Sequence, residues 1–260
     1  RSRVHDWSPG AAVAGALGFL AAGWLVYDQI CRRFGQRKDA DGRVTIGNDG
    51  LVLGLIAVFI AVASWGAAQL FAGRAAFLIV GATLATMMTA NVAHWIIPGQ
   101  KKVIAQMRAG QKPDPVYGQR GKQRSVHNTY FGLPVLIAML SNHYGMLYQH
   151  PHNWVVLCVL MAAGVAIRVF FVKRHKGVNS WGAVALALAL LAGLIAWMAP
   201  RPQPAAAASA APVTLAQVQA VATQRCLACH MGDAAQKGVR LDTAEGLLAH
   251  KAQIHQQVAV

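Results

Sequence analysis

The stretch "LVLGLIAVFIAVASWGAAQL", residues 51–70, decides the fold class of this chain because it holds no charged residue. A helix of about 20 apolar residues is long enough to cross the hydrocarbon core of a membrane. A soluble domain carries about a quarter charged residues, whereas this chain of 260 residues is 13% charged and 55% hydrophobic. The sequence therefore predicts an all-α, polytopic helical membrane protein.

Five further apolar runs lie on either side of this segment. We expect six spanning helices in all, at residues 10–30, 50–72, 75–97, 129–149, 153–172 and 180–199. Together they define a helical transmembrane domain over residues 1–200. A Pro/Ala-rich stretch at 201–213 predicts a semi-rigid linker. Residues 214–260 then predict a small second domain.

Positive charge gathers in three of the segments between the apolar runs. The net charge is +15, and most of the lysines and arginines lie in residues 31–49, 98–128 and 173–179. The positive-inside rule places these three loops in the cytoplasm and both chain ends outside. Because the charge follows membrane topology, the expected partner is the lipid bilayer, and no nucleic-acid partner is predicted.

The motif "RCLACH", residues 225–230, is typical of c-type haem attachment. In this interpretation Cys226 and Cys229 bind the haem vinyl groups, and His230 is an axial ligand of the iron. An apolar face that begins after Thr214 predicts an amphipathic helix leading into the motif, with Thr214 as its N-cap. A zinc half-site would need a second ligand pair at suitable spacing, and a redox dithiol would need a βαβ setting. The context favours haem c.

The second axial ligand of this haem is not evident. Met231 directly follows His230 and cannot reach the opposite haem face, and only 30 residues follow His230. Either His250 or His255 is the ligand, or the ligand lies on sequence beyond this chain. We expect a truncated cytochrome c domain, and the first residue, Arg1, suggests that sequence is also missing at the other end.

Ionisable and amide side chains inside spanning helices are costly, and they raise a functional hypothesis. Seven such candidates are Asn91, His94, Arg124, His127, Asn128 and Arg168 at the cytoplasmic end and His143 at the outer end. The inner cluster could recognise a planar anion through arginine and amide edges, or paired histidines could hold a b-type haem. Taken singly, each residue could instead bond a neighbouring helix, and Arg168 could extend to the inner surface.

Two stretches carry a family resemblance: "NVAHWIIPGQKKVIAQMRAGQKPDP" (91–115) and "RSVHNTYFGLPVLIAMLSNHY" (124–144). They resemble the membrane-bound, cytochrome c-fused urate hydroxylases (the PuuD family), whose membrane part is called the urate oxidase N-terminal domain. The resemblance implies oxidation of urate to 5-hydroxyisourate in purine breakdown. It also implies a bacterial inner membrane, a periplasmic haem domain and about eight spanning helices, so we expect a fragment.

Under this resemblance the predicted residues acquire roles. Arg124 or Arg168 would hold urate, His94, His127 or His143 would take a proton, and electrons would pass through haem c to a soluble or membrane respiratory acceptor. Since the haem lies outside and most candidates lie inside, across about 30 Å of hydrocarbon, either a second redox centre bridges them or urate binds near His143. An electron-transfer cytochrome fed by quinol or a partner enzyme, and a transporter, are the alternatives.

Overall fold

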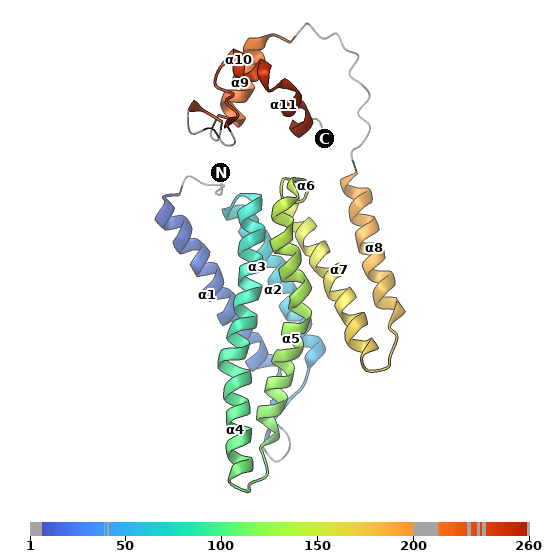
Figure 1. The fold of residues 1–260 in the computed structure, drawn as a ribbon. Helices are drawn as coiled ribbons and strands as arrows, with labels where there is room; N and C mark the ends of the chain where they lie inside the picture. Colours follow the sequence, from blue (N-terminus) through green and yellow to red (C-terminus); the bar gives the residue numbers. More distant parts are fainter. Residues whose placement is uncertain are drawn as a thin grey trace. The chain divides into compact units, whose positions relative to one another are not determined.

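The computed structural model describes residues 7–38, 40, 42–199, 213–227, 230–232, 235 and 238–258. The chain forms two compact units, residues 1–199 and residues 200–260. Both are built mainly of α-helices (Figure 1). Most of the predicted linker lies outside the described residues.

The first unit is a bundle of long apolar helices. In the described part of the chain, five of them are long and apolar enough to cross a membrane: α1 (Pro9–Phe34), α2 (Asp49–Leu70), the continuous helix Gly73–Arg108, α7 (Asn153–Arg174) and α8 (Trp181–Met198). The chain is therefore a multi-pass helical membrane protein, as the sequence predicted. The start of α1 and the end of α8 lie at the same end of the bundle (Figure 1), as a topology with both ends on one side requires.

The remaining predicted span, residues 129–149, which is the fourth along the chain, differs from expectation. It is divided among the second half of α5 (Pro115–Leu140), a 3₁₀ turn η2 (Ser141–His143) and the short helix α6 (Gly145–Tyr148). Its helix also begins much earlier, at Pro115, because Asp114 caps it by accepting a hydrogen bond from the Val116 N–H at 3.0 Å. The charged first half of α5 explains why composition alone concealed this boundary.

The expectation that residues 98–128 form a loop is wrong. The helix α3 (Gly73–Asn91) continues through a π turn η1 (Val92–Ile96) into α4 (Ile97–Arg108). Pro98 has no N–H to donate to the carbonyl four residues earlier, and a π turn next to it accommodates that loss. With the start of α5, α4 forms a helical hairpin that extends beyond the other helices (Figure 1).

The predicted loop 31–49 also contains ordered structure. Strands β1 (Gln36–Lys38) and β2 (Val44–Ile46) pair antiparallel, with Arg37 opposite Thr45. The Ile46 N–H donates to Oε1 of Gln119 at 3.1 Å, which attaches β2 to α5. This attachment positions the hairpin beside the first turns of α5.

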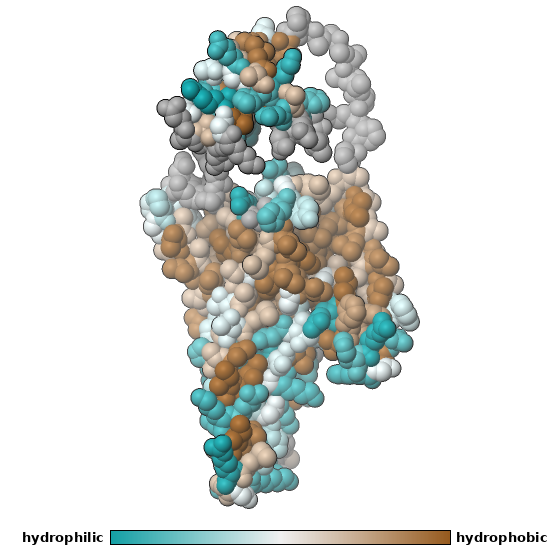
Figure 2. All heavy atoms as spheres, in the orientation of Figure 1, coloured by the Kyte–Doolittle hydropathy of each residue, from teal (hydrophilic) through white to brown (hydrophobic). Residues whose placement is uncertain are grey.

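Small residues allow the central helices to approach closely. A Cβ atom added to Gly81 on α3 would lie 2.7 Å from Cβ of Ala138 on α5, and one added to Gly23 on α1 would overlap Thr83. Close backbone approach at small residues is a common way for membrane helices to pack. Figure 2 shows a hydrophobic band over the helices and a more hydrophilic α4–α5 hairpin, which is consistent with a lipid-facing bundle.

The second unit contains α9 (Leu215–Arg225), α10 (Ala244–Ala249) and α11 (Lys251–Val258). Thr214 caps α9 in a capping box with Gln217, so the predicted N-cap and amphipathic helix are confirmed. A small core forms around Ala222, Leu241 and Leu247. The segment after α9, which carries Cys226, packs against this core.

Candidate functional site

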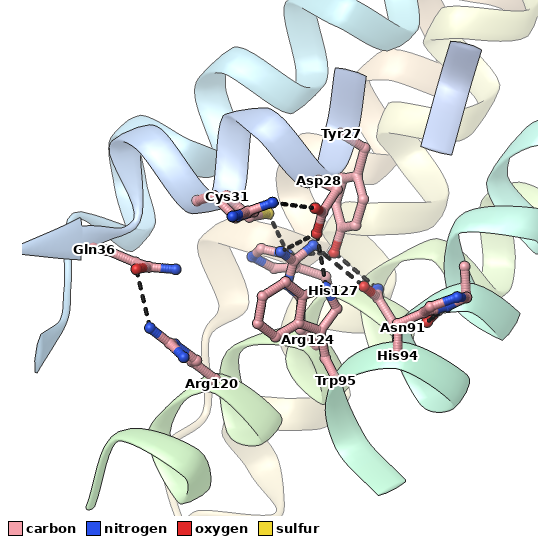
Figure 3. A network of polar contacts seen from close by, with 12 residues as sticks. Tyr27, Asp28, Cys31, Gln36, Asn91, His94, Trp95, Arg120, Arg124 and His127 are labelled. Atoms are coloured by element: carbon pink, nitrogen blue, oxygen red, sulfur yellow. Dashed lines mark hydrogen bonds and ion pairs between the residues drawn. The ribbon is translucent and has the colours of Figure 1, made fainter. Parts of the chain in front are cut away.

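A buried polar network joins α1, α3 and α5 near the end of the bundle from which the α4–α5 hairpin extends (Figure 3). Four of its residues were predicted from the sequence: Asn91, Arg124, His127 and Asn128. Asn91, Arg124 and His127 are 0%, 3% and 2% exposed. Asn91 is the last residue of the 19-residue helix α3, which places the network about 27 Å from the first residue of that helix.

Asn91 is the central residue of the network. Arg124 Nη1 donates to Oδ1 of Asn91 at 3.3 Å, and an arginine can only donate, so the orientation of the Asn91 amide follows. Its Nδ2 then donates to Oδ1 of Asn128 and to the hydroxyl oxygen of Tyr27, both at 2.8 Å. Asn128 in turn donates to the carbonyl of Met88 at 3.0 Å. The two amides therefore have defined orientations.

Arg124 also forms a buried ion pair with Asp28 on α1. Its Nη2 lies 2.7 Å from Oδ1 of Asp28, which also accepts a 2.7 Å hydrogen bond from Nε1 of Trp95. The guanidinium carbon lies 5.0 Å from the ring centre of Tyr27 and 5.1 Å from that of Trp95, within the range of cation–π attraction. The charge of Arg124 is thus already balanced within the network.

The hydroxyl of Tyr27 links this ion pair to His127. Because the Tyr27 oxygen accepts from Asn91, its own proton is available to Nδ1 of His127 at 2.9 Å. Cys31 Sγ lies 3.8 Å from the same nitrogen. The ring of Phe131 packs against both aromatic groups, with centroids 5.8 Å from Tyr27 and 6.3 Å from His127. When the Tyr27 hydroxyl donates to Nδ1, the neutral ring of His127 carries its proton on Nε2.

Four residues of the network were not predicted: Tyr27, Asp28, Cys31 and Trp95. Asp28 carried a usable signal, since it lies near the end of the first apolar run, where a carboxylate is costly without a partner. Nothing in the local pattern indicated that its partner would be Arg124, 96 positions away.

The other three candidates lie outside the network. His94 is exposed, with Nδ1 3.1 Å from the carbonyl of Ala90 and its ring beside Trp24. His143 is exposed in η2, on the far side of the span from the network. Arg168 on α7 is half-buried and donates through Nε to the carbonyl of Thr129 at 3.3 Å.

The haem motif lies in the second unit, where Cys229 is outside the described residues. Cys226 follows α9 and is half-buried. Nδ1 of His230 lies 2.9 Å from the carbonyl of Val239. This contact requires the proton on Nδ1, so Nε2 is unprotonated and its lone pair is available to a metal ion. That tautomer is the one an axial iron ligand needs, so His230 and Cys226 fit a bound haem c.

Of the two distal-ligand candidates, His250 has a similar contact, with Nδ1 3.0 Å from Oε1 of Gln253, and His255 is exposed. The choice between them stays a prediction. Among the described residues, no cluster of three or more His, Cys, Asp or Glu side chains could hold a metal ion.

A polar network buried at one end of a multi-pass helical bundle is a candidate functional centre of a membrane protein. The family model described as "Urate oxidase N-terminal" matches residues 1–199, and the chain belongs to this family. The family resemblance of residues 91–115 and 124–144 is thereby confirmed for the membrane domain, whereas the fused cytochrome stays a prediction. No curated protein and no solved structure matches the chain.

Proposed function

We propose that this protein oxidises urate to 5-hydroxyisourate in the bacterial inner membrane and passes the electrons to a covalently bound haem c. From there they go to a soluble or membrane respiratory acceptor. The observation that carries the proposal is the family match over residues 1–199. The gathering of four predicted residues from two helices into one network that also includes α1 supports it.

The reaction sets what the protein must supply. Urate and water give 5-hydroxyisourate, two protons and two electrons. The site must therefore bind an anion, accept protons and pass on two electrons. The buried network meets the second of these needs through a neutral histidine that is hydrogen-bonded to a phenol.

In this proposal His127 and Tyr27 form the proton-accepting pair. Nδ1 of His127 faces the Tyr27 hydroxyl at 2.9 Å, so a proton can pass along the pair without movement of either ring. Asn91 holds the Tyr27 oxygen in place. Because Asp28 balances Arg124, we assign Arg124 to orienting Asn91 and Tyr27, and the anion must be held by other cations.

The second unit is proposed to hold haem c through Cys226, Cys229 and His230. When bound, haem c accepts one electron at a time from the membrane domain. Nδ1 of His230 is held by the Val239 carbonyl, which keeps the imidazole in the tautomer that ligates iron. Because the network lies at the inner end of the span and the haem is proposed to be periplasmic, the proposal includes a second electron carrier in the membrane domain.

One observation favours a second candidate, an electron-transfer cytochrome that oxidises quinol. A cavity of about 400 Å³ between α2, α5 and α7 has an almost wholly apolar lining that includes Tyr130, Pro134 and Cys158. An apolar cavity with a single phenol could accept the ring of a membrane quinol. This candidate predicts haem reduction by quinol and none by urate.

The visible spectrum of the purified full-length protein tests both candidates. Urate should reduce the haem, and the haem absorbance bands show which types of haem are present. His127→Gln should slow urate-dependent reduction by about 100-fold or more, as expected for loss of a general base. His175→Gln is the matched control, since His175 is exposed at the end of α7. Reduction by quinol alone would replace the first candidate with the second.

A further inference from the structure

A second polar feature lies outside the buried network, between the β1–β2 hairpin and the start of α5. It is a cavity of about 640 Å³, which we call the hairpin cavity, with equal polar and apolar character in its lining. Its polar side chains are Arg43, Thr45, Lys112, Asp114, Gln119 and Arg120. The volume is within the range of small-molecule sites.

The charge of the hairpin cavity is unbalanced among the described residues that line it. Arg43 lines the cavity but is engaged in a contact of its own. Lys112 and Arg120 contribute two further cations, and Asp114 contributes the one carboxylate of the lining. That carboxylate is engaged in capping α5 through the Val116 N–H. A surplus of cations in a concave site attracts anions.

Arg120 is incompletely satisfied within the described part of the chain. Its Nη2 donates to Oε1 of Gln36 at 3.1 Å, but its Nε is buried and has no hydrogen-bond partner. An unpartnered buried donor is costly and needs an explanation. An acceptor on a ligand in the cavity would provide one. A guanidinium edge binds planar groups with two adjacent acceptors especially well.

Trp95 connects this cavity to the buried network (Figure 3). The guanidinium carbon of Arg120 lies 5.7 Å from the centre of the Trp95 ring, and that of Arg124 lies 5.1 Å from it. Trp95 also donates to Asp28. A ligand on Arg120 would therefore be one aromatic ring away from the network.

We propose that the hairpin cavity binds a planar purine anion, urate in the reaction above, through the planar edge of Arg120 and the charge of Lys112. The inference rests on the proposed function and adds the substrate site that the network lacks. Attraction by charge alone would serve any anion, whereas the unpartnered Nε adds a directed donor for an acceptor atom of the ligand.

Equilibrium dialysis of radiolabelled urate against the detergent-solubilised chain tests this site without turnover. Arg120→Gln should raise the Kd by about tenfold or more, as expected for loss of a charge-assisted hydrogen bond. Arg120→Lys keeps the charge and loses the planar edge, so it should also weaken binding. Lys112→Gln should weaken binding less, and excess chloride, which carries charge without paired acceptors, should compete poorly. Lys122→Gln is the control, because Lys122 is exposed on the same helix and does not line the cavity.

The outcomes separate this site from the proposed function. Unchanged urate binding in Arg120→Gln, with urate still reducing the haem, would overturn the site and leave the function intact. Binding that depends on Arg120 without any haem reduction would support the site and contradict the oxidation. Equal loss in Arg120→Gln and Lys122→Gln, or strong competition by chloride, would reduce the site to general charge attraction and overturn the planar-anion inference. Absence of urate binding in the unaltered chain would overturn both.

Discussion

Replacing Arg124 by methionine removes one side of the buried ion pair. Asp28, 9% exposed, would keep its charge and lose the 2.7 Å contact with Nη2 of Arg124. Breaking a buried pair from one side costs about 3–5 kcal/mol. The same change removes the hydrogen bond to Asn91 and the stacking on two aromatic rings. We therefore expect a loss in this range in the free energy of unfolding.

A double-mutant cycle isolates the pair. Asp28→Asn combined with Arg124→Met should cost less than the two single changes together, with a coupling of about 1–3 kcal/mol, because neither charge is then left alone. Reversible unfolding of the detergent-solubilised chain, followed by circular dichroism, supplies the free energies. Arg32→Met is the control, since Arg32 lies 3.9 Å from the same carboxylate but is 54% exposed, so it should cost less than about 1 kcal/mol. A coupling within about 0.5 kcal/mol of zero would refute the reasoning.

Three further predictions concern packing, the phenol and the haem motif. Gly81→Val should destabilise the chain by about 1–3 kcal/mol, because the valine side chain would meet Ala138. Gly132→Val is the control and should not destabilise it, because a Cβ added there meets no atom within 4 Å. Equal melting temperatures of the two variants would contradict this prediction. Tyr27→Phe should cost about 1–2 kcal/mol in unfolding free energy, since Asn91 and His127 both lose a partner. Cys226→Ala with Cys229→Ala should abolish haem staining on a denaturing gel, and persistent staining would exclude covalent attachment there.

Much of the membrane architecture could be read from composition and charge. Five helices of the bundle coincide closely with apolar runs because the transfer of each residue from water to lipid depends mainly on its own side chain. The failures have a common cause. The first half of α5 and all of α4 extend beyond the apolar runs, where hydropathy no longer distinguishes a helix from a loop. The N-cap Asp114 and the proline at the first helical position, Pro115, mark the true start of α5.

Part of the site was predictable because single residues stand out in apolar helices. Asn91, Arg124, His127 and Asn128 stood out because amide and charged groups are rare in spanning helices. Asp28, Tyr27 and Trp95 did not, although without them Arg124 would be a buried, unpaired charge. Their role depends on the rotation of α1 against α3 and α5, which no local pattern records.

The amino-acid sequence alone was enough to predict a multi-pass helical domain, the candidate haem motif and the urate oxidase N-terminal family, because each of these is encoded in short stretches whose physical meaning is local. The tertiary structure decided which polar groups meet. Close packing at Gly23 and Gly81 brings three helices together, balances Arg124 with Asp28, and leaves Arg120 as the cation with an unpartnered buried nitrogen in the described cavity. Such pairings depend on distances between segments 33 to 100 positions apart, and packing sets those distances.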